Sequence, residues 1–245
     1  MEDIKTGRSV IAKAAVSISG GWSRWGNIAQ EAHHAGAFLH PYIAVVYDMA
    51  VDKNDDLFMI MEDLPNRTLK EWLEFDHPLE EIGAVLDKVS SALEYVHTKM
   101  GLIFADMKPA NIGFDELWNP KLIDFGISKH MDETGEAEAG DEFTPMYTSP
   151  EQRRGSVIDI RSDVYSLAAT IFAIFVDRTS DENRDRFEKD LDNVVPFRRD
   201  YDKTLSTERK LAISRVLHKA LSKDPKDRHH TVKEFNDEFQ NALGS

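Results

Sequence analysis

One stretch, residues 104–126, constrains what this chain can fold into more than any other. It reads Phe-Ala-Asp-Met-Lys-Pro-Ala-Asn-Ile-Gly-Phe, then a short connector, then Lys-Leu-Ile-Asp-Phe-Gly. It carries three oxygen-bearing side chains, Asp106, Asn111 and Asp124, with Lys108 between the first two. The apolar segments on either side of the connector predict a hairpin. Because the loops that enter and leave a hairpin lie at the same end of it, we expect the three side chains to lie close together.

The chemistry of these side chains suits the transfer of a phosphoryl group. Mg²⁺ prefers hard oxygen ligands, and one or two protein groups often bind it together with substrate phosphates. Asn111 and Asp124 are therefore the candidate metal ligands. Asp106 is then free to orient a hydroxyl group and accept its proton, while Lys108 can neutralise charge on the moving phosphoryl group. Each of these short motifs alone is more often an ordinary capped turn, so the prediction of phosphoryl transfer depends on their occurrence together.

The order of these residues resembles the protein kinase family, in which a catalytic loop (His-Arg-Asp, four residues, Asn) is followed by Asp-Phe-Gly. The similarity is greatest to eukaryotic-like Ser/Thr kinases of bacterial or phage type and extends over residues 3–243. It implies an α+β bilobal fold, with a reduced antiparallel N-lobe plus one helix over residues 1–63 and a mainly helical C-lobe over residues 64–245. It also implies that ATP is the phosphoryl donor and that Mg²⁺ is the metal.

A second candidate pair, Lys13 and Glu31, precedes this stretch. Lys13 lies in an apolar strand expected over residues 9–18, and Glu31 shares the apolar face of a helix expected over residues 28–39. A lysine in such a strand can simply be an edge residue that points to water. A carboxylate beside an inward-facing apolar stripe, however, needs a partner. In the family a strand lysine pairs with a helix glutamate and holds the α- and β-phosphates, so the resemblance implies this pair.

The resemblance also assigns residues around the adenine base. Met61 would be the gatekeeper, with plain core packing as its other interpretation, and the segment from Glu62 to Leu64 would be the hinge whose backbone binds adenine. Ile11 takes a position usually held by alanine above the ring, and Gly113 takes one usually held by a bulky residue below it. A bulky residue above the ring and a small one below it are expected to shift the adenine.

Four further residues would support the site if the resemblance holds. Thr144 matches the threonine that braces the catalytic acid and lysine in Ser/Thr-directed members. Asp163 would hold the backbone of the catalytic loop, and its other interpretation is an ordinary acid at a helix N-terminus. Glu151 and Arg228 would form the buried ion pair that anchors the end of the activation segment.

Two departures from the family pattern affect the expected function. Only twelve residues precede Lys13, which leaves room for about one strand and a turn but not for the glycine-rich loop that covers ATP phosphates. We expect either a reduced N-lobe, which a partner or a second copy could complete, or a chain that begins after its natural start. Phe104-Ala105 replaces the usual His-Arg pair, so no arginine is present there to bind a phosphorylated activation loop. Activity is therefore expected without phosphorylation of Thr134.

Composition excludes several other classes of function. The formal net charge of −14 argues against a nucleic-acid or anionic-membrane surface. The absence of cysteine excludes disulfides and thiolate metal sites. The most apolar stretch, residues 164–176, is shorter than the roughly 20 residues that span a bilayer, and no signal peptide is visible. These features predict a soluble cytoplasmic protein.

Apolar spacing predicts the remaining secondary structure. Strands are expected over residues 43–47 and 57–61 and helices over residues 69–75, 78–100 and 211–221, with further helices opened near Arg161 and Thr231.

Two functions from different classes remain open at this stage. The first is an active kinase that transfers the γ-phosphate of ATP to Ser or Thr of a protein. The acidic residues of the loop at 127–148 could select a basic substrate, although such a run is more often a solvated face. The second is a pseudokinase that binds a nucleotide or a partner. An enzyme whose acceptor is not a protein lies between them.

Overall fold

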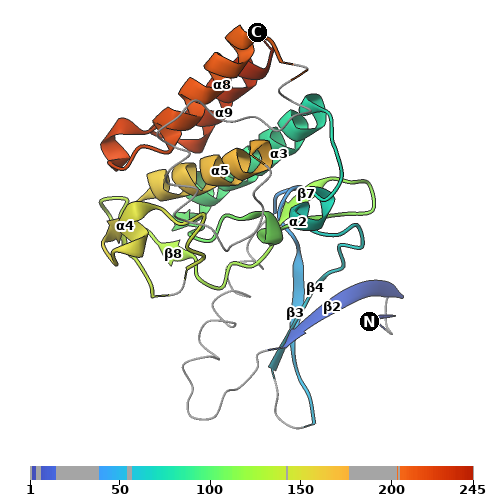
Figure 1. The fold of residues 1–245 in the computed structure, drawn as a ribbon. Coiled ribbons are helices and arrows are strands. Elements are labelled where there is room, and N and C mark those ends of the chain that lie inside the picture. Colours follow the sequence, from blue (N-terminus) through green and yellow to red (C-terminus); the bar gives the residue numbers. More distant parts are fainter. Residues whose placement is uncertain are drawn as a thin grey trace.

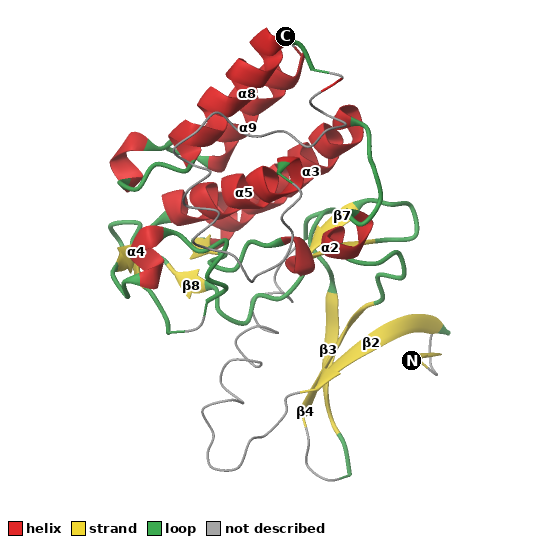
Figure 2. Cartoon of the chain, in the orientation of Figure 1, coloured by secondary structure: helices red, strands yellow, loops and turns green. Residues whose placement is uncertain are grey.

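The computed structural model describes residues 2–3, 7–14, 39–53, 57–141, 143–176, 203 and 205–244. In this part of the chain a small antiparallel sheet is followed by a mainly helical region, which gives an α+β fold in two parts (Figures 1 and 2). Glu31 and the helix expected over residues 28–39 lie outside the described residues, apart from Leu39, which is in a loop.

Four antiparallel strands form the sheet, in the order β1-β2-β4-β3. The strands are β1 (Glu2–Asp3), β2 (Arg8–Ala14), β3 (Val46–Val51) and β4 (Leu57–Glu62). The third strand begins three residues later than the sequence predicts. The reason is that residues 42–44 bond instead to β7 of the helical region: Ala44 N–H donates to Leu122 O at 2.9 Å, and Leu122 N–H donates to Tyr42 O at 2.9 Å.

Three short pairs of strands lie at the boundary between the sheet and the helices. The predicted hairpin is present as β6 (Ile112–Phe114) and β7 (Pro120–Leu122), with Ile112 opposite Leu122. Strand β5 (Leu102–Ile103) pairs with β8 (Lys129–His130), and β9 (Ala137–Glu138) pairs with β10 (Val157–Ile158). These pairs fix the backbone on both sides of residues 104–128.

The helical region is built around α3 (Leu79–Met100) and α5 (Ile160–Phe175), which lie side by side in Figure 1. Most of α5 is completely buried, as its nearly uniform apolar sequence predicts. Helices α8 (Thr207–Ala220) and α9 (Val232–Gly244) pack on them. The short helix α2 (Leu69–Trp72) packs on β6 near the sheet, and the short helix α4 (Pro150–Arg153) packs on β10.

The ends of the helices follow local capping chemistry. Helix α3 ends at Gly101, whose φ of +61° favours glycine. Helix α8 begins four residues earlier than predicted because the Ser206 side chain accepts a hydrogen bond from Arg209 N–H. Helix α2 ends at Trp72, three residues before the predicted end. Among the described residues, no helix combines the length and apolarity needed to cross a membrane.

Candidate active site

Four of the predicted residues meet in one hydrogen-bonded cluster around Asp106. Lys108 Nζ lies 2.9 Å from Asp106 Oδ2 and donates to Thr144 Oγ1 at 2.8 Å. Thr144 Oγ1 lies 3.2 Å from Asp106 Oδ1, and Asn111 Nδ2 donates to Asp106 Oδ2 at 2.8 Å. Both oxygens of Asp106 are thereby fixed in direction, because charged and neutral donors hold them from different sides.

The backbone before Asp106 is held by a buried carboxylate. Asp163, in the first turns of α5, is fully buried and accepts hydrogen bonds from Phe104 N–H at 2.7 Å and Ala105 N–H at 2.8 Å. His97 Nε2 shares a third hydrogen bond with the same carboxylate at 2.8 Å. Ala105 has a φ of +65°, which is uncommon for a residue with a side chain, so these bonds maintain an otherwise unfavourable backbone. Sequence reasoning did not identify His97.

Asp124 begins the loop that follows the hairpin. Its φ is +68°, and its Oδ1 accepts from Lys13 Nζ at 2.8 Å and from Gly126 N–H at 3.4 Å. Burial alone would raise the pKa of Asp124. The hydrogen bond and charge of Lys13, together with Gly126 N–H and the charge of Lys108, outweigh burial and lower this pKa below its ordinary value. Asp124 is therefore ionised at neutral pH.

Asn111 and Asp124 are brought together by the hairpin. The Ile123 N–H donates to Asn111 O at 3.0 Å, which joins the two loops directly. Since Asn111 Nδ2 donates to Asp106, its amide oxygen is the atom left for a cation. The described residues contain no group of three or more His, Cys, Asp or Glu side chains that could hold a metal alone. A site with two oxygen donors fits Mg²⁺ that is also bound by substrate phosphates.

Glu62, which is expected at the start of the hinge, makes contacts that the sequence did not predict. Its backbone N–H donates to Val45 O at 2.8 Å, so this donor is not free for adenine. Its side chain forms an ion pair with Lys121 Nζ at 2.9 Å and accepts from Val45 N–H at 3.1 Å. Lys121 lies on β7, so this pair connects the end of β4 to the β6–β7 hairpin. The signal that sequence reasoning could have used is the position of Lys121 between the apolar residues Pro120 and Leu122.

The space expected beneath the adenine base is partly filled by the hinge. A Cβ atom on residue 113 would lie 2.6 Å from Leu64 Cδ1, so the glycine lets Leu64 pack directly on β6. Met61 is buried and lies opposite Ile11 in the β2–β4 pair. Ile11 is 42% exposed, which leaves its side chain accessible to a ligand.

The expected Lys13–Glu31 pair cannot be followed in the described part of the chain, because Glu31 lies outside it. Lys13 lies on β2 opposite Met59, and it crosses from the sheet to contact Asp124 in the helical region. This ion pair links the two parts of the fold across the candidate active site.

Glu151 and Arg228 form a bidentate ion pair. Arg228 Nη1 lies 2.7 Å from Glu151 Oε1, and Arg228 Nη2 donates to Oε2 at 2.8 Å. Ser162 Oγ also donates to Oε1, at 2.7 Å. Burial alone would raise the pKa of Glu151, but the hydrogen bonds and charge of Arg228, aided by Ser162, lower it to about 2.

The segment between Asp124 and Glu151 is held by apolar contacts. They are made at Ala105, the position where the resemblance to the family would place an arginine. Ala105 is buried in a cluster with Ile103 and Ile158. Side chains from the segment itself pack on this cluster: Met131, Ala137 and Ala139. Strands β8 and β9 supply the backbone bonds of the same region.

Comparison with known proteins agrees with this geometry. A model of the protein kinase domain family matches residues 2–239. A probable serine/threonine-protein kinase of Corynebacterium efficiens is 31% identical over 84% of this chain and 33% of its own length. The serine/threonine-protein kinase PknB of Mycolicibacterium smegmatis is 33% identical over 84% of this chain and 34% of its own length. PrkC of Bacillus subtilis is 26% identical over 87% of this chain and 33% of its own length.

The chain thus spans about a third of the length of these curated relatives. The family match covers nearly the whole of it, including every residue of the cluster around Asp106. This chain belongs to the protein kinase domain family.

Proposed function

We propose that this domain transfers the γ-phosphate of ATP to a Ser or Thr hydroxyl of a protein substrate. The observation that carries the proposal is the closed network of Asp106, Lys108, Asn111 and Thr144. Catalysis of phosphoryl transfer is largely positioning and electrostatic stabilisation, and a network of this kind supplies both. A chain used only for binding has no need to hold these four side chains in mutual contact.

Asp106 would accept the proton of the attacking hydroxyl group. Its oxygens are already aimed by Thr144 and Asn111, so little reorganisation is needed when a hydroxyl group arrives. Lys108 lies beside Asp106 and would neutralise charge on the phosphoryl oxygens during transfer. Thr144 holds Lys108 and Asp106 together, which makes it a positioning residue for both.

Asn111 and Asp124 would hold Mg²⁺, which supplies charge neutralisation to the phosphates when bound. Lys13 would hold the non-transferred phosphates. In the present structure Lys13 instead donates to Asp124 Oδ1, so it already lies next to the residues assigned to the metal. The depressed pKa keeps Asp124 anionic, as a metal ligand must be.

The experiment is transfer of labelled γ-phosphate from Mg·ATP, with modified sites mapped by mass spectrometry. Asp106→Asn and Asp124→Asn are expected to reduce transfer by about 10²-fold or more, since the first removes the proton acceptor and the second a metal ligand. Asp237→Asn is the matched control, because Asp237 is an exposed carboxylate on α9 that pairs with Lys233. Equal incorporation in the wild type and the Asp106 variant would rule out the assigned chemistry.

Two readouts of the same assay address the open alternatives. Label on Ser or Thr of an added protein identifies a protein acceptor. Specific activity that rises with protein concentration indicates that a second copy completes the N-lobe. No incorporation under any condition favours the pseudokinase alternative.

A further inference from the structure

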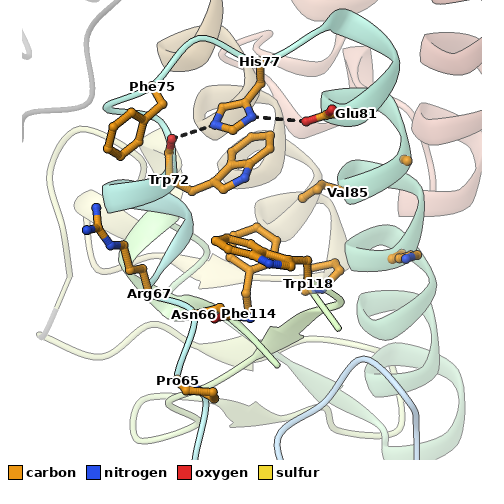
Figure 3. A pocket seen from close by; sticks show the side chains of 13 residues that line it. Pro65, Asn66, Arg67, Trp72, Phe75, His77, Glu81, Val85, Phe114 and Trp118 are labelled. Carbon is orange, nitrogen blue, oxygen red and sulfur yellow. Dashed lines mark hydrogen bonds and ion pairs between the residues drawn. The ribbon is translucent and has the colours of Figure 1, made fainter. Parts of the chain in front are cut away.

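A cavity lies outside the candidate active site. Its volume is about 780 Å³, and four aromatic rings line it: Trp72, Phe75, Phe114 and Trp118. The rings come from α2 and its following turn, from β6 and from the hairpin turn, and α3 closes one side with Val85 (Figure 3). We call this cavity the aromatic pocket. A pocket of this size and lining is typical of a binding site.

The inner wall of the aromatic pocket is rigid. The Trp72 and His77 rings are stacked with centroids 3.3 Å apart, and His77 Nε2 lies 2.8 Å from Trp72 O. His77 Nδ1 also lies 3.2 Å from Glu81 Oε2 on α3, as Figure 3 shows. The Trp72 and Phe114 centroids are 5.7 Å apart. The pocket is thus formed before any ligand binds, which lowers the entropic cost of binding.

The rim of the aromatic pocket exposes large apolar side chains. Phe75 is 58% exposed, Trp118 is 51% exposed and the neighbouring Leu117 is 82% exposed. Single exposed apolar residues are ordinary, but three grouped around a cavity indicate an interaction surface.

Two backbone positions with positive φ line the aromatic pocket. Among the described residues, four non-glycine residues have φ near +60° to +70°. Ala105 and Asp124 belong to the candidate active site, and Arg67 and Trp118 both line the aromatic pocket. A bulky residue such as tryptophan rarely adopts this conformation, and it persists only where the surrounding structure imposes it. The hairpin turn does so here, because Trp118 N–H donates to Asp115 O at 3.0 Å, and it fixes the direction of the Trp118 side chain.

A second hollow adjoins the aromatic pocket and is strongly acidic. Its volume is about 460 Å³, and Pro65 lines both cavities. Its lining includes four carboxylates and neither lysine nor arginine: Glu62, Asp63, Asp115 and Glu116. Lys121 offsets the charge of Glu62. Asp115 accepts hydrogen bonds from Leu117 N–H and Asn119 N–H, and Asp63 accepts one from Ser9 Oγ, but these neutral donors leave both negative charges in place beside that of Glu116. We call it the acidic hollow, and its charge selects a cationic occupant.

We propose that the two cavities together dock an extended segment of a partner protein. One or two large apolar side chains of that segment would enter the aromatic pocket, and lysine or arginine side chains nearby would lie at the acidic hollow. Pro65 lines both cavities, and together their volumes exceed the roughly 300–1,000 Å³ of a small-molecule site. An extended chain can reach both, with apolar anchors giving affinity and charge giving orientation.

This surface is distinct from the residues assigned to phosphoryl transfer, although the same hairpin serves both and Glu62 and Asp63 of the acidic hollow belong to the segment expected to bind adenine. Asn111 precedes β6, whereas Phe114 and Trp118 lie at its far end and in the turn. Docking would raise the local concentration of a tethered substrate without altering the reacting groups. Binding itself does not depend on the proposed function, so it is measured directly.

The test uses fluorescence anisotropy with the full chain and labelled peptides. Each peptide joins Arg-Arg-Arg to Trp-Leu through about two to five serines, in both orders, since each extended residue spans about 3.5 Å. Matched peptides carry Glu in place of Arg or Ala in place of Trp and Leu. At least one Arg/Trp-Leu peptide is expected to bind about tenfold more tightly than both of its matched peptides.

Three variants locate the binding. Trp118→Ala removes a wall of the aromatic pocket, and Ala84→Trp fills it from the exposed side of α3. Each is expected to weaken binding about tenfold, the effect of losing a central apolar contact. Glu116→Lys should weaken binding of the Arg-containing peptide. It should not weaken binding of the matched peptide that carries Glu in place of Arg. Leu211→Ala, an exposed apolar residue on α8, is the control that leaves binding unchanged.

The outcomes separate this inference from the proposed function. Asp106→Asn should bind the peptide as the wild type does even where it abolishes transfer. Absence of binding by every Arg/Trp-Leu peptide, or equal binding by all variants, would overturn the docking proposal. Competition by N-acetyltryptophanamide as strong as that by the whole peptide would show that a small molecule, not a protein segment, is the occupant.

Discussion

Two ion pairs of similar geometry flank the activation segment, and they differ in their surroundings. Lys13 and Asp124 precede the segment, with an N–O distance of 2.8 Å and side chains that are 34% and 42% exposed. Arg228 and Glu151 follow it, with an N–O distance of 2.7 Å and side chains that are 0% and 6% exposed. The first pair can exchange its partners with water or a ligand, whereas the second cannot.

The difference indicates which pair supports the fold and which is available for chemistry. Breaking a buried pair leaves a charge without solvent or partner, which costs far more than breaking an exposed pair. The exposed pair joins the sheet to the helical region, at the position where the proposed function places the nucleotide phosphates. The buried pair joins α4 to the segment before α9, entirely within the helical region.

The largest effect on folding is expected when the buried pair is broken. Arg228→Ala should lower the free energy of unfolding by about 3–5 kcal/mol, since it strands the Glu151 carboxylate. Lys13→Ala should lower it by about 1 kcal/mol or less, because its pair is partly solvated. Urea unfolding of both variants measures the contrast. Equal losses would show that burial does not distinguish the two pairs.

The next prediction concerns pH. The pKa of Glu151 is about 2 in the folded chain, against an ordinary value of 4.5. Because the folded pKa is lower, the stabilisation is fully present above about pH 4.5 and is lost as pH falls towards 2. The shift corresponds to about 3 kcal/mol. Stability curves of the wild type and Glu151→Gln between pH 6 and 2 should differ in slope across this window. Parallel curves would contradict the assignment.

A smaller loss of stability is expected at the segment from Glu62 to Leu64, the expected hinge. Gly113→Ala places a methyl group against Leu64, and the overlap should cost about 1–3 kcal/mol of stability or shift the hinge. The double variant with Leu64→Ala should recover part of the loss, because the overlapping group is removed. Thermal unfolding and ATP affinity of the single and double variants measure this. A double variant that is no better than the single would exclude Leu64 as the cause.

The sequence predicted the local parts of the site better than the distant ones. Asp106, Asn111 and Asp124 lie in one short stretch, so their spacing and a hairpin were enough to predict that they meet. Glu151 and Arg228 are 77 residues apart, and nothing local relates them; their pairing came only from resemblance to a family. The late start of β3 had no local signal, because it depends on bonds from residues 42–44 to β7.

The aromatic pocket was not predicted at all, for a related reason. Its rings come from separate segments, and each ring alone fits a helix or strand that packs in a core. Trp72 and Phe114 are indeed buried, whereas Phe75 and Trp118 are not. Sequence spacing reports which residues share a face, but it does not report that two faces remain apart and leave a cavity between them.

A substitution in the exposed turn of the segment between the two ion pairs should have the smallest effect, in this case on phosphoryl transfer. Asp132 Oδ1 accepts from Thr134 N–H at 2.8 Å, Thr134 Oγ1 at 2.6 Å and Glu136 N–H at 3.1 Å, and the Thr134 hydroxyl is the main cause of a lowered Asp132 pKa. This turn is closed by a carboxylate of the chain itself. The apolar cluster around Ala105 holds the neighbouring strands, so we expect both parts to be ordered without a phosphate.

Thr134→Val should therefore change phosphoryl transfer by about twofold at most, as expected for an exposed substitution. Phosphatase treatment of the wild type should likewise leave the rate unchanged. Ala105→Asp is the contrasting variant, because it places a charge in the buried cluster and should reduce both stability and transfer. A rate that falls with phosphatase treatment would mean that a phosphate, rather than the apolar cluster, holds the segment between the ion pairs.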